Sequence, residues 1–344
     1  MKNKNTIYIA VLTLVVIGST MFVLHERGEV REQGIGNIVS NILDEARELF
    51  EGENGEEMAE ETKEEAIADN PTYEHVHSVF RIPTDGTILM GAHTGLFKST
   101  DNGKMFERTQ IKSSDSSVNP DGEFMNFAYD GTNKILYGGT HDSGLLKSTD
   151  FGLTWSKADT GIDGQDIHGL AINPLDTNLI YAYSVNKGLF GTKDRAKSWN
   201  KIDDGPKNPN VKGFAYMATL TSMDRGMKKE GRTDIGYLWA GTGGGLYSSF
   251  ACFCGWNPAE SIQTSVTVYA LAADPLNKSA MLIAEKDGLY RTTDEGKSFT
   301  KVSSELINVG ALWFDIENSK VVLAVTNAGV MYESDDSGIS WNKK

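Results

Sequence analysis

A glycine followed by two apolar residues recurs six times within residues 71–344, and this repeat constrains the fold more than any other feature of the chain. The copies begin at Gly95, Gly144, Gly188, Gly245, Gly288 and Gly329. Each belongs to a unit of four short β-prone runs separated by turn residues. Four strands in roughly 40 to 50 residues are typical of a propeller blade. The sequence therefore predicts an all-β fold, a six-bladed β-propeller, and a seventh blade would need residues that the chain lacks.

The turn after the third predicted strand keeps a second pattern, Ser/Thr-x-Asp-x-Gly followed by an aromatic residue. Five aspartates occupy its central position: Asp101, Asp150, Asp194, Asp294 and Asp336. The copy around Asp194 is weaker, because Ala196 replaces the glycine. The carboxylate and hydroxyl can accept amide hydrogens of the turn, glycine supplies a positive φ, and the aromatic ring packs between neighbouring sheets. We therefore assign these aspartates a structural role.

This turn resembles the Asp-box, or BNR, repeat of sialidases, sortilin-type receptors, xyloglucan hydrolases and the photosystem II assembly factor that is a membrane-associated propeller. The resemblance covers residues 75–344. In those families the Asp-box lies on an outer turn away from the ligand face, so the resemblance implies a fold and leaves the activity open. The assembly factor is the nearest functional analogy, and it implies a binding or assembly role.

The predicted last strand, which ends near Lys344, belongs to the same blade as the strands before it. Ring closure is therefore expected to depend on packing of blade six against blade one. No strand would be exchanged between the two blades.

The N-terminus carries a candidate membrane anchor. Residues 7–24 contain no charged side chain and would form a helix of about 27 Å, close to the hydrocarbon thickness of a bilayer. Lys2 and Lys4 precede this stretch and acidic residues follow it, so a cytoplasmic N-terminus and an extracytoplasmic remainder are predicted. The length of the run favours an uncleaved anchor over a signal peptide. We expect residues 1–25 to form a cytoplasmic tip and a single-pass transmembrane helix.

Acidic residues concentrate between this anchor and the propeller. Residues 26–70 contain 15 Asp or Glu and 4 Lys or Arg, and so carry most of the chain's net charge of −14. This segment is predicted to be an acidic stalk with a short amphipathic helix, either a solvated spacer or a docking helix. The acidic balance argues against a nucleic-acid partner, because such binding requires a basic surface that releases counterions.

Five of the six histidines fall in blades one to three: His75, His77, His93, His141 and His168. In a propeller the start of the inner strand and the end of the second strand meet on one face, beside the central channel, and all five histidines map there. Four carboxylates map to the same rim: Glu74, Glu123, Asp142 and Asp166. We therefore predict a His-rich rim on blades one to three.

Zinc and copper bind imidazole nitrogens, and carboxylate oxygens next to such ligands hydrogen-bond to the histidines and fix their tautomers. An imidazole cluster flanked by carboxylates therefore matches a zinc or copper site. Two alternatives stay open. The rim could bind a protein, a glycan or another polar ligand without a metal, or its histidines could only hydrogen-bond to neighbouring loops. The sequence thus favours a membrane-anchored, extracytoplasmic propeller that acts as a binding or assembly module through this rim.

Glycoside hydrolysis, sialidase-like or by another exo-glycosidase, is the alternative function. Residues 80–83 read Phe-Arg-Ile-Pro, a motif that supplies one arginine of the sialidase site. Pro83 aligns with Pro174 and Pro275 in the turn after the inner strand, so Arg81 is expected at the far end of that strand, away from the sialidase position. A glycosidase also needs two carboxylates about 5 to 9.5 Å apart. We therefore assign no catalytic residue.

Cys252 and Cys254 occupy the blade-four turn where an Asp-box would stand, on the face predicted to be opposite the histidines. A single C-x-C pair provides neither a disulfide framework nor a zinc finger. We interpret it as a local turn staple or as free thiols rather than as metal ligands. Residues 219–235 of the same blade are comparatively basic and are predicted to form an exposed loop, a candidate contact site.

Overall fold

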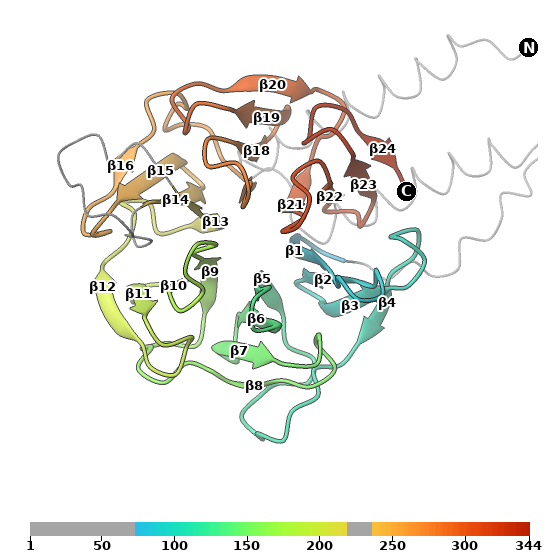
Figure 1. The fold of residues 1–344 in the computed structure, drawn as a ribbon, viewed down its shortest axis with the longest axis vertical. Coiled ribbons are helices and arrows are strands. Elements are labelled where there is room, and N and C mark those ends of the chain that lie inside the picture. Colours follow the sequence, from blue (N-terminus) through green and yellow to red (C-terminus); the bar gives the residue numbers. More distant parts are fainter. Residues whose placement is uncertain (1–72, 219–235) are drawn as a thin grey trace, which may run out of the picture. The chain divides into compact units, whose positions relative to one another are not determined.

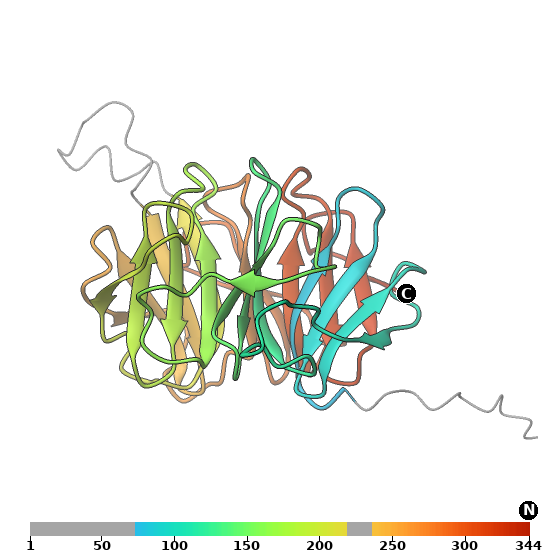
Figure 2. The same cartoon turned by 90° about the horizontal axis from the view of Figure 1, so that it is seen from below.

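Six four-stranded antiparallel sheets stand around a central axis in the computed structural model, which describes residues 73–218 and 236–344 (Figure 1). Every sheet is built from four consecutive strands, so each blade is one continuous stretch of chain. The predicted six-bladed β-propeller is therefore confirmed. Seen from the side, the strands of each blade run between the two faces of the ring (Figure 2).

Each blade begins with its innermost strand and ends with its outermost. Blades one and two contain β1 (Val76–Arg81), β2 (Ile88–Ala92), β3 (Gly95–Ser99), β4 (Glu107–Thr109), β5 (Phe124–Asp130), β6 (Ile135–Thr140), β7 (Leu145–Ser148) and β8 (Ser156–Lys157). Blades three and four contain β9 (Ile167–Ile172), β10 (Ile180–Ser184), β11 (Gly188–Thr192), β12 (Asn200–Asp203), β13 (Val211–Ala218), β14 (Gly236–Thr242), β15 (Gly245–Phe250) and β16 (Asn257–Pro258). Blades five and six contain β17 (Ala270–Ala273), β18 (Met281–Glu285), β19 (Gly288–Thr292), β20 (Thr300–Ser303), β21 (Val309–Phe314), β22 (Val322–Thr326), β23 (Met331–Ser334) and β24 (Asn342–Lys343).

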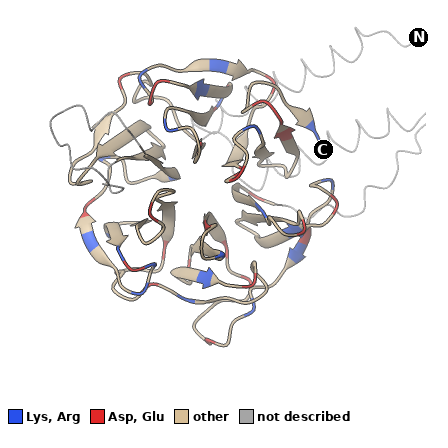
Figure 3. Cartoon of the chain, in the orientation of Figure 1, with Lys and Arg blue, Asp and Glu red and all other residues tan. Residues whose placement is uncertain are grey.

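The residue pattern of each strand matches its distance from the axis. The second strands β2, β10 and β18 are buried at every position, because a neighbouring blade covers each face of the sheet. The outer strands are polar and largely exposed, and Figure 3 shows lysine and arginine on β4, β8, β12 and β20. The apolar core therefore lies between the blades.

The aromatic residue after each Asp-box belongs to this core. Trp155 is only 3% exposed, and its ring lies 4.6 Å from that of Phe124. Trp199 and Phe106 are buried in the same kind of position between two sheets, and Phe299 and Trp341 are partly buried there. Truncating a buried aromatic side chain costs about 3–5 kcal/mol, so these rings are principal links between blades.

Blade six closes the ring by packing directly against blade one, as predicted. Met331 of β23 shares one buried cluster with Val76 and Val79 of β1. The Val76 amide donates to Asn327 Oδ1 at 3.1 Å, and Arg81 forms an ion pair of 2.8 Å with Glu333. All four strands of blade six come from its own segment, so no strand is exchanged within residues 73–218 and 236–344.

The chain divides between Asn70 and Pro71 into two units, and the propeller belongs to the second. The predicted anchor, the acidic stalk and the loop 219–235 all lie outside the described residues. Within the part of the chain that the structure does describe, we find no helix with the length and apolar character required for a membrane span.

Candidate functional site

A β-bulge at the start of the inner strands sets the geometry of the channel mouth. Five inner strands skip one residue in their register with the second strand: His77, Met125, His168, Lys212 and Gly310. A bulge leaves the extra residue without a ladder partner and re-aims its side chain. Equivalent positions lie at one level of the ring, so His77, His168 and Lys212 share one end of the central channel.

The blade-one histidines lie against one another. The ring of His93 is 4.5 Å from that of His77 and 5.2 Å from that of His75. Burial, and secondarily His93 and His168, lowers the pKa of His77 to about 3, so its ring is neutral at pH 7. His77 Nε2 is buried and has no hydrogen-bond partner among the described residues. The ring therefore packs against His93 and leaves its Nε2 unpaired within the described residues.

Blades two and three bring three possible metal ligands together. One ligand atom from each of His141, Asp166 and His168 can be chosen so that all lie within 4.8 Å of one another. His168 Nδ1 lies 3.1 Å from the carbonyl oxygen of Val211, to which it can only donate. His168 Nε2 then faces Asp166 Oδ1 at 2.9 Å. Both atoms are buried and neither makes a hydrogen bond of acceptable geometry within the described residues.

The contact between His168 Nε2 and Asp166 Oδ1 brings two electron-rich atoms together. With Nδ1 protonated, a neutral His168 presents the lone pair of Nε2 to a carboxylate oxygen, and the two would repel. A proton on Nε2 or a cation bound by both atoms would satisfy them. The carbonyl on Nδ1 fixes the tautomer that leaves Nε2 available as a ligand, as the outer hydrogen bonds of metal-bound histidines do.

Glu123 lies beside this group. Burial raises the pKa of its carboxyl, and the nearby Asp142 and Asp166 raise it further, while His141 opposes them. The Glu123 backbone carbonyl also accepts the amide hydrogen of His141 at 3.1 Å. Glu123 is thus an additional carboxyl near the three ligands and contributes to the negative potential there when ionised.

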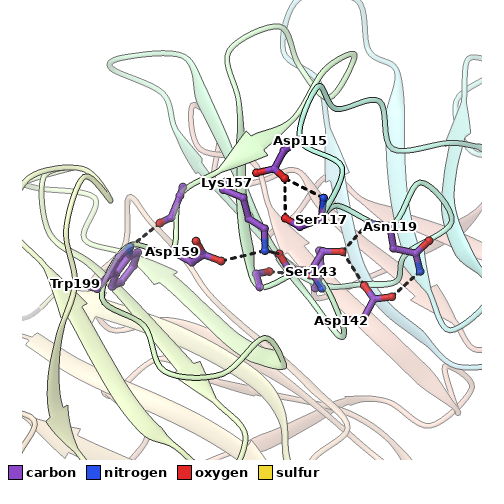
Figure 4. A network of polar contacts seen from close by, with 11 residues as sticks. Asp115, Ser117, Asn119, Asp142, Ser143, Lys157, Asp159 and Trp199 are labelled. Atoms are coloured by element: carbon purple, nitrogen blue, oxygen red, sulfur yellow. Dashed lines mark hydrogen bonds and ion pairs between the residues drawn. The ribbon is translucent and has the colours of Figure 1, made fainter.

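The other two predicted rim carboxylates have different surroundings. Asp142 accepts hydrogen bonds from Asn119 Nδ2 at 2.6 Å and from Ser143 Oγ at 2.9 Å, within a polar network that holds the loop before β5 (Figure 4). Glu74 lies at a positive φ and acts electrostatically on His93, whose pKa it raises against the larger lowering effect of burial. The predicted rim residues therefore form two adjoining groups, one on blade one and one on blades two and three.

The five Asp-box aspartates all close their own hairpins. In each box the aspartate Oδ1 accepts the hydroxyl of the Ser or Thr two residues earlier at 2.6 to 2.8 Å and the amide four residues later at 2.8 to 3.0 Å. Hydrogen bonds from Ser298 and Thr292 lower the pKa of Asp294 to about 2. Asp194, Asp101, Asp150 and Asp336 also have lowered pKa values.

Cys252 and Cys254 form a disulfide across one residue. The bridge is possible because the segment turns: Ala251 and Phe253 both have positive φ, which an extended segment would not have. Phe253 is buried, with its ring 4.8 Å from that of Tyr181. Of the two interpretations left open by the sequence, the structure shows the turn staple.

Arg81 is engaged in the structure of the ring. It is the last residue of β1, and its guanidinium contacts Glu333 Oε1 at 2.8 Å and Asn102 Oδ1 at 2.9 Å. These contacts lie at the opposite end of β1 from His77. The Phe-Arg-Ile-Pro sequence therefore serves ring closure.

Lys212 is the rim residue that sequence reasoning missed. Its blade has no proline to align with Pro174, so its equivalence to His168 is hidden. A shorter pattern reveals it, because an apolar residue, the bulged residue and a small residue follow one another in Val211-Lys212-Gly213 and in Ile167-His168-Gly169. Both bulges use the small residue to let the neighbouring blade approach the backbone.

No protein-family model and no curated protein matches the chain. Solved structures share the fold. The GH74 enzyme from Niastella koreensis is 16% identical and aligns over 79% of this chain and 45% of its own, with a TM-score of 0.54. The GH74 xyloglucanase from Xanthomonas campestris is 19% identical over 79% of this chain and 46% of its own, with a TM-score of 0.49. The chain thus spans less than half the length of these two enzymes.

YCF48 from Cyanidioschyzon merolae is 17% identical and aligns over 80% of this chain and 86% of its own, with a TM-score of 0.47. A further YCF48 structure holds a D1 peptide. The expected resemblance to Asp-box propellers is confirmed at the level of the fold. At these identities the similarity carries no information about activity.

Proposed function

We propose that this propeller is a binding module whose rim holds a transition metal, zinc or copper, on His141, Asp166 and His168. The observation that carries the proposal is the arrangement of His168, whose Nδ1 is bound to the Val211 carbonyl and whose buried Nε2 stands unpaired beside Asp166 Oδ1. Two imidazoles and a carboxylate are donors that both metals accept. Three protein ligands leave a coordination position for a partner or ligand.

Metal titration of the full chain tests this site. We expect one equivalent of Zn²⁺ or Cu²⁺ to bind, and Cu²⁺ to show nitrogen coupling in its electron paramagnetic resonance spectrum. His141→Ala changes an exposed residue and should weaken binding at least about tenfold without disturbing the fold. His75→Ala removes an exposed histidine from the same rim and is the matched control. A wild-type chain that binds no metal, or equal losses in both variants, would refute the proposal.

We also propose that the module is anchored in a membrane and faces the extracytoplasmic side, where it binds a protein or a glycan. The uncharged residues 7–24 support the anchor. The Cys252–Cys254 disulfide supports the location, because disulfides persist in oxidising compartments.

Thiol labelling in cells tests the location. Both cysteines of the full chain should resist a maleimide reagent until a reductant is added. A variant that lacks residues 1–25 would stay in the cytoplasm, and its cysteines should react at once. Free thiols in the full chain would contradict the proposed location.

Glycoside hydrolysis is a second candidate, favoured by one observation. Glu123 has a raised pKa next to the carboxylates of Asp142 and Asp166, and glycosidases pair a protonated carboxyl with an ionised one. Release of sugar from xyloglucan or sialosides by the wild-type chain, lost in Glu123→Gln, would establish this activity. If the metal-loaded chain hydrolyses neither substrate, the binding role remains the proposed function.

A further inference from the structure

The central channel contains a cavity of about 530 Å³, walled by the inner strands. Sites for small molecules typically enclose about 300–1,000 Å³. The inner strands β1 and β9 have six residues each, so the channel is roughly 20 Å deep. The cavity is therefore long enough for an extended chain of carbon atoms.

Small residues at one level keep this space open. Four alanines line the cavity in four successive blades: Ala128, Ala171, Ala215 and Ala272. In blades one and six, Phe80 and Trp313 occupy the corresponding position and supply apolar wall. A larger aliphatic residue in place of any of these alanines would narrow the channel. The bulge sets which residue of each inner strand stands at this level. The register of the bulges therefore determines the width of the cavity as well as the residues of the rim.

The two ends of the cavity differ in charge. At the His-rich end it is lined by Lys212 and His77. The Lys212 side chain forms no ion pair or hydrogen bond with any described residue, and His77 Nε2 is buried and unpaired there. At the opposite end, Leu175 and Leu276 are 43% and 57% exposed at the mouth, which is also lined by one residue of each charge, Lys278 and Glu317.

We propose that the channel binds a single-chain carboxylate amphiphile, with its carboxylate on Lys212 Nζ and His77 Nε2–H and its apolar chain along the alanine level. A carboxylate leaving water needs charge-assisted hydrogen bonds, and a lysine without an ion pair beside an unpaired imidazole nitrogen supplies them. The alkyl chain would replace water against Phe80 and Trp313. None of the three proposed metal ligands lines the cavity, so the carboxylate site and the metal site use different residues at the same end of the channel.

Calorimetric titration of the full chain, held in amphipol, with decanoate tests the proposal. The wild type should bind one decanoate, and decyltrimethylammonium should bind at least about tenfold more weakly. Lys212→Met removes the charge and should weaken decanoate binding at least about tenfold. Lys278→Met removes a lysine from the opposite mouth and should change decanoate affinity less than twofold.

A second variant fills the cavity and leaves the charge in place. Ala215→Leu should abolish decanoate binding while Lys212 is retained, and thermal unfolding will show whether the variant is folded. Unchanged decanoate affinity in Lys212→Met, or tighter binding of the cation, would overturn the proposal. Retained Zn²⁺ binding in Lys212→Met would show that any loss concerns the channel alone.

Discussion

The bulged residues are the positions where a single side chain decides the chemistry of the channel mouth. His77, His168 and Lys212 occupy equivalent places in three blades, yet each has a different partner. His168 is bound to the Val211 carbonyl and lies against Asp166, whereas His77 is half-buried and its Nε2 is buried and unpaired. An unsatisfied buried polar atom lowers stability by about 1–3 kcal/mol, and a ligand that bound His77 Nε2 would remove this cost.

Acid should destabilise the protein through His77. Its pKa is about 3 in the fold and near 6.5 when unfolded, so below pH 6.5 only the unfolded chain binds this proton. Stability is then lost as the pH falls, by up to about 1.4 kcal/mol per pH unit from this group. His77→Leu should flatten the decline between pH 6.5 and 4.5 in urea unfolding. His75→Leu is the control, and an equal slope in His77→Leu and wild type would contradict the assignment.

At the scale of the element, the Asp-box hairpin is the repeated unit that orients each outer strand. The Ser or Thr hydroxyl accepts the amide hydrogen of the glycine, while the aspartate accepts two or more further hydrogens of the turn. The backbone amides of the turn are thus hydrogen-bonded within the turn itself. The aromatic residue that follows is then directed between two sheets. This explains why the pattern survives with alanine at position 196, where the backbone also has positive φ.

Asp294→Ala should lower the melting temperature by roughly 2–6 °C, because it leaves the amide of Ser298 and the hydroxyl of Thr292 without their acceptor. This difference from wild type should disappear towards pH 2. A carboxylate whose pKa is lowered in the fold stabilises the fold above about pH 4, and that contribution is lost as the pH falls and the carboxyl protonates. Asp287→Ala, which breaks an exposed ion pair with Lys301 in the same blade, should have a smaller effect. Differential scanning calorimetry compares the two, and equal effects would count against the turn mechanism.

The whole ring is closed by packing and by polar contacts between blades six and one. Blade six shares a buried cluster with blade one, and Arg81 bridges to Glu333 with both side chains more than four-fifths buried. In the described part of the chain no strand is exchanged at any blade junction, but a loop joins every other pair of neighbouring blades, whereas no loop joins blade six to blade one. The junction is therefore the place where unfolding is expected to begin.

Arg81→Met and Glu333→Met should each destabilise the protein by about 1–3 kcal/mol, because the first leaves Glu333 with Lys344 alone and the second leaves Arg81 without a carboxylate partner. The double variant should lose less than the sum of the two, since both charges are then absent. Urea unfolding of the four proteins measures the coupling. Additive losses would mean that the ion pair does not stabilise the closure.

The sequence by itself determined the number of blades, the Asp-box hairpins and the closure by packing. These features depend on residues close together in the chain, such as Asp294 and Ser298, or on the period of the repeat. It also placed the histidines on one rim, because equivalent positions of a repeat must share a level. The predicted anchor and stalk lie outside the described residues and stay predictions.

Only the tertiary structure decided which rim residues meet. It separated the histidines of blade one from the group of His141, Asp166 and His168, and it drew Asp142 into another network. It added Lys212 to the channel and turned the chain at Phe253 so that the two cysteines bridge. Such contacts join segments more than 20 residues apart or depend on one backbone angle, and the spacing of a repeat carries no information about either.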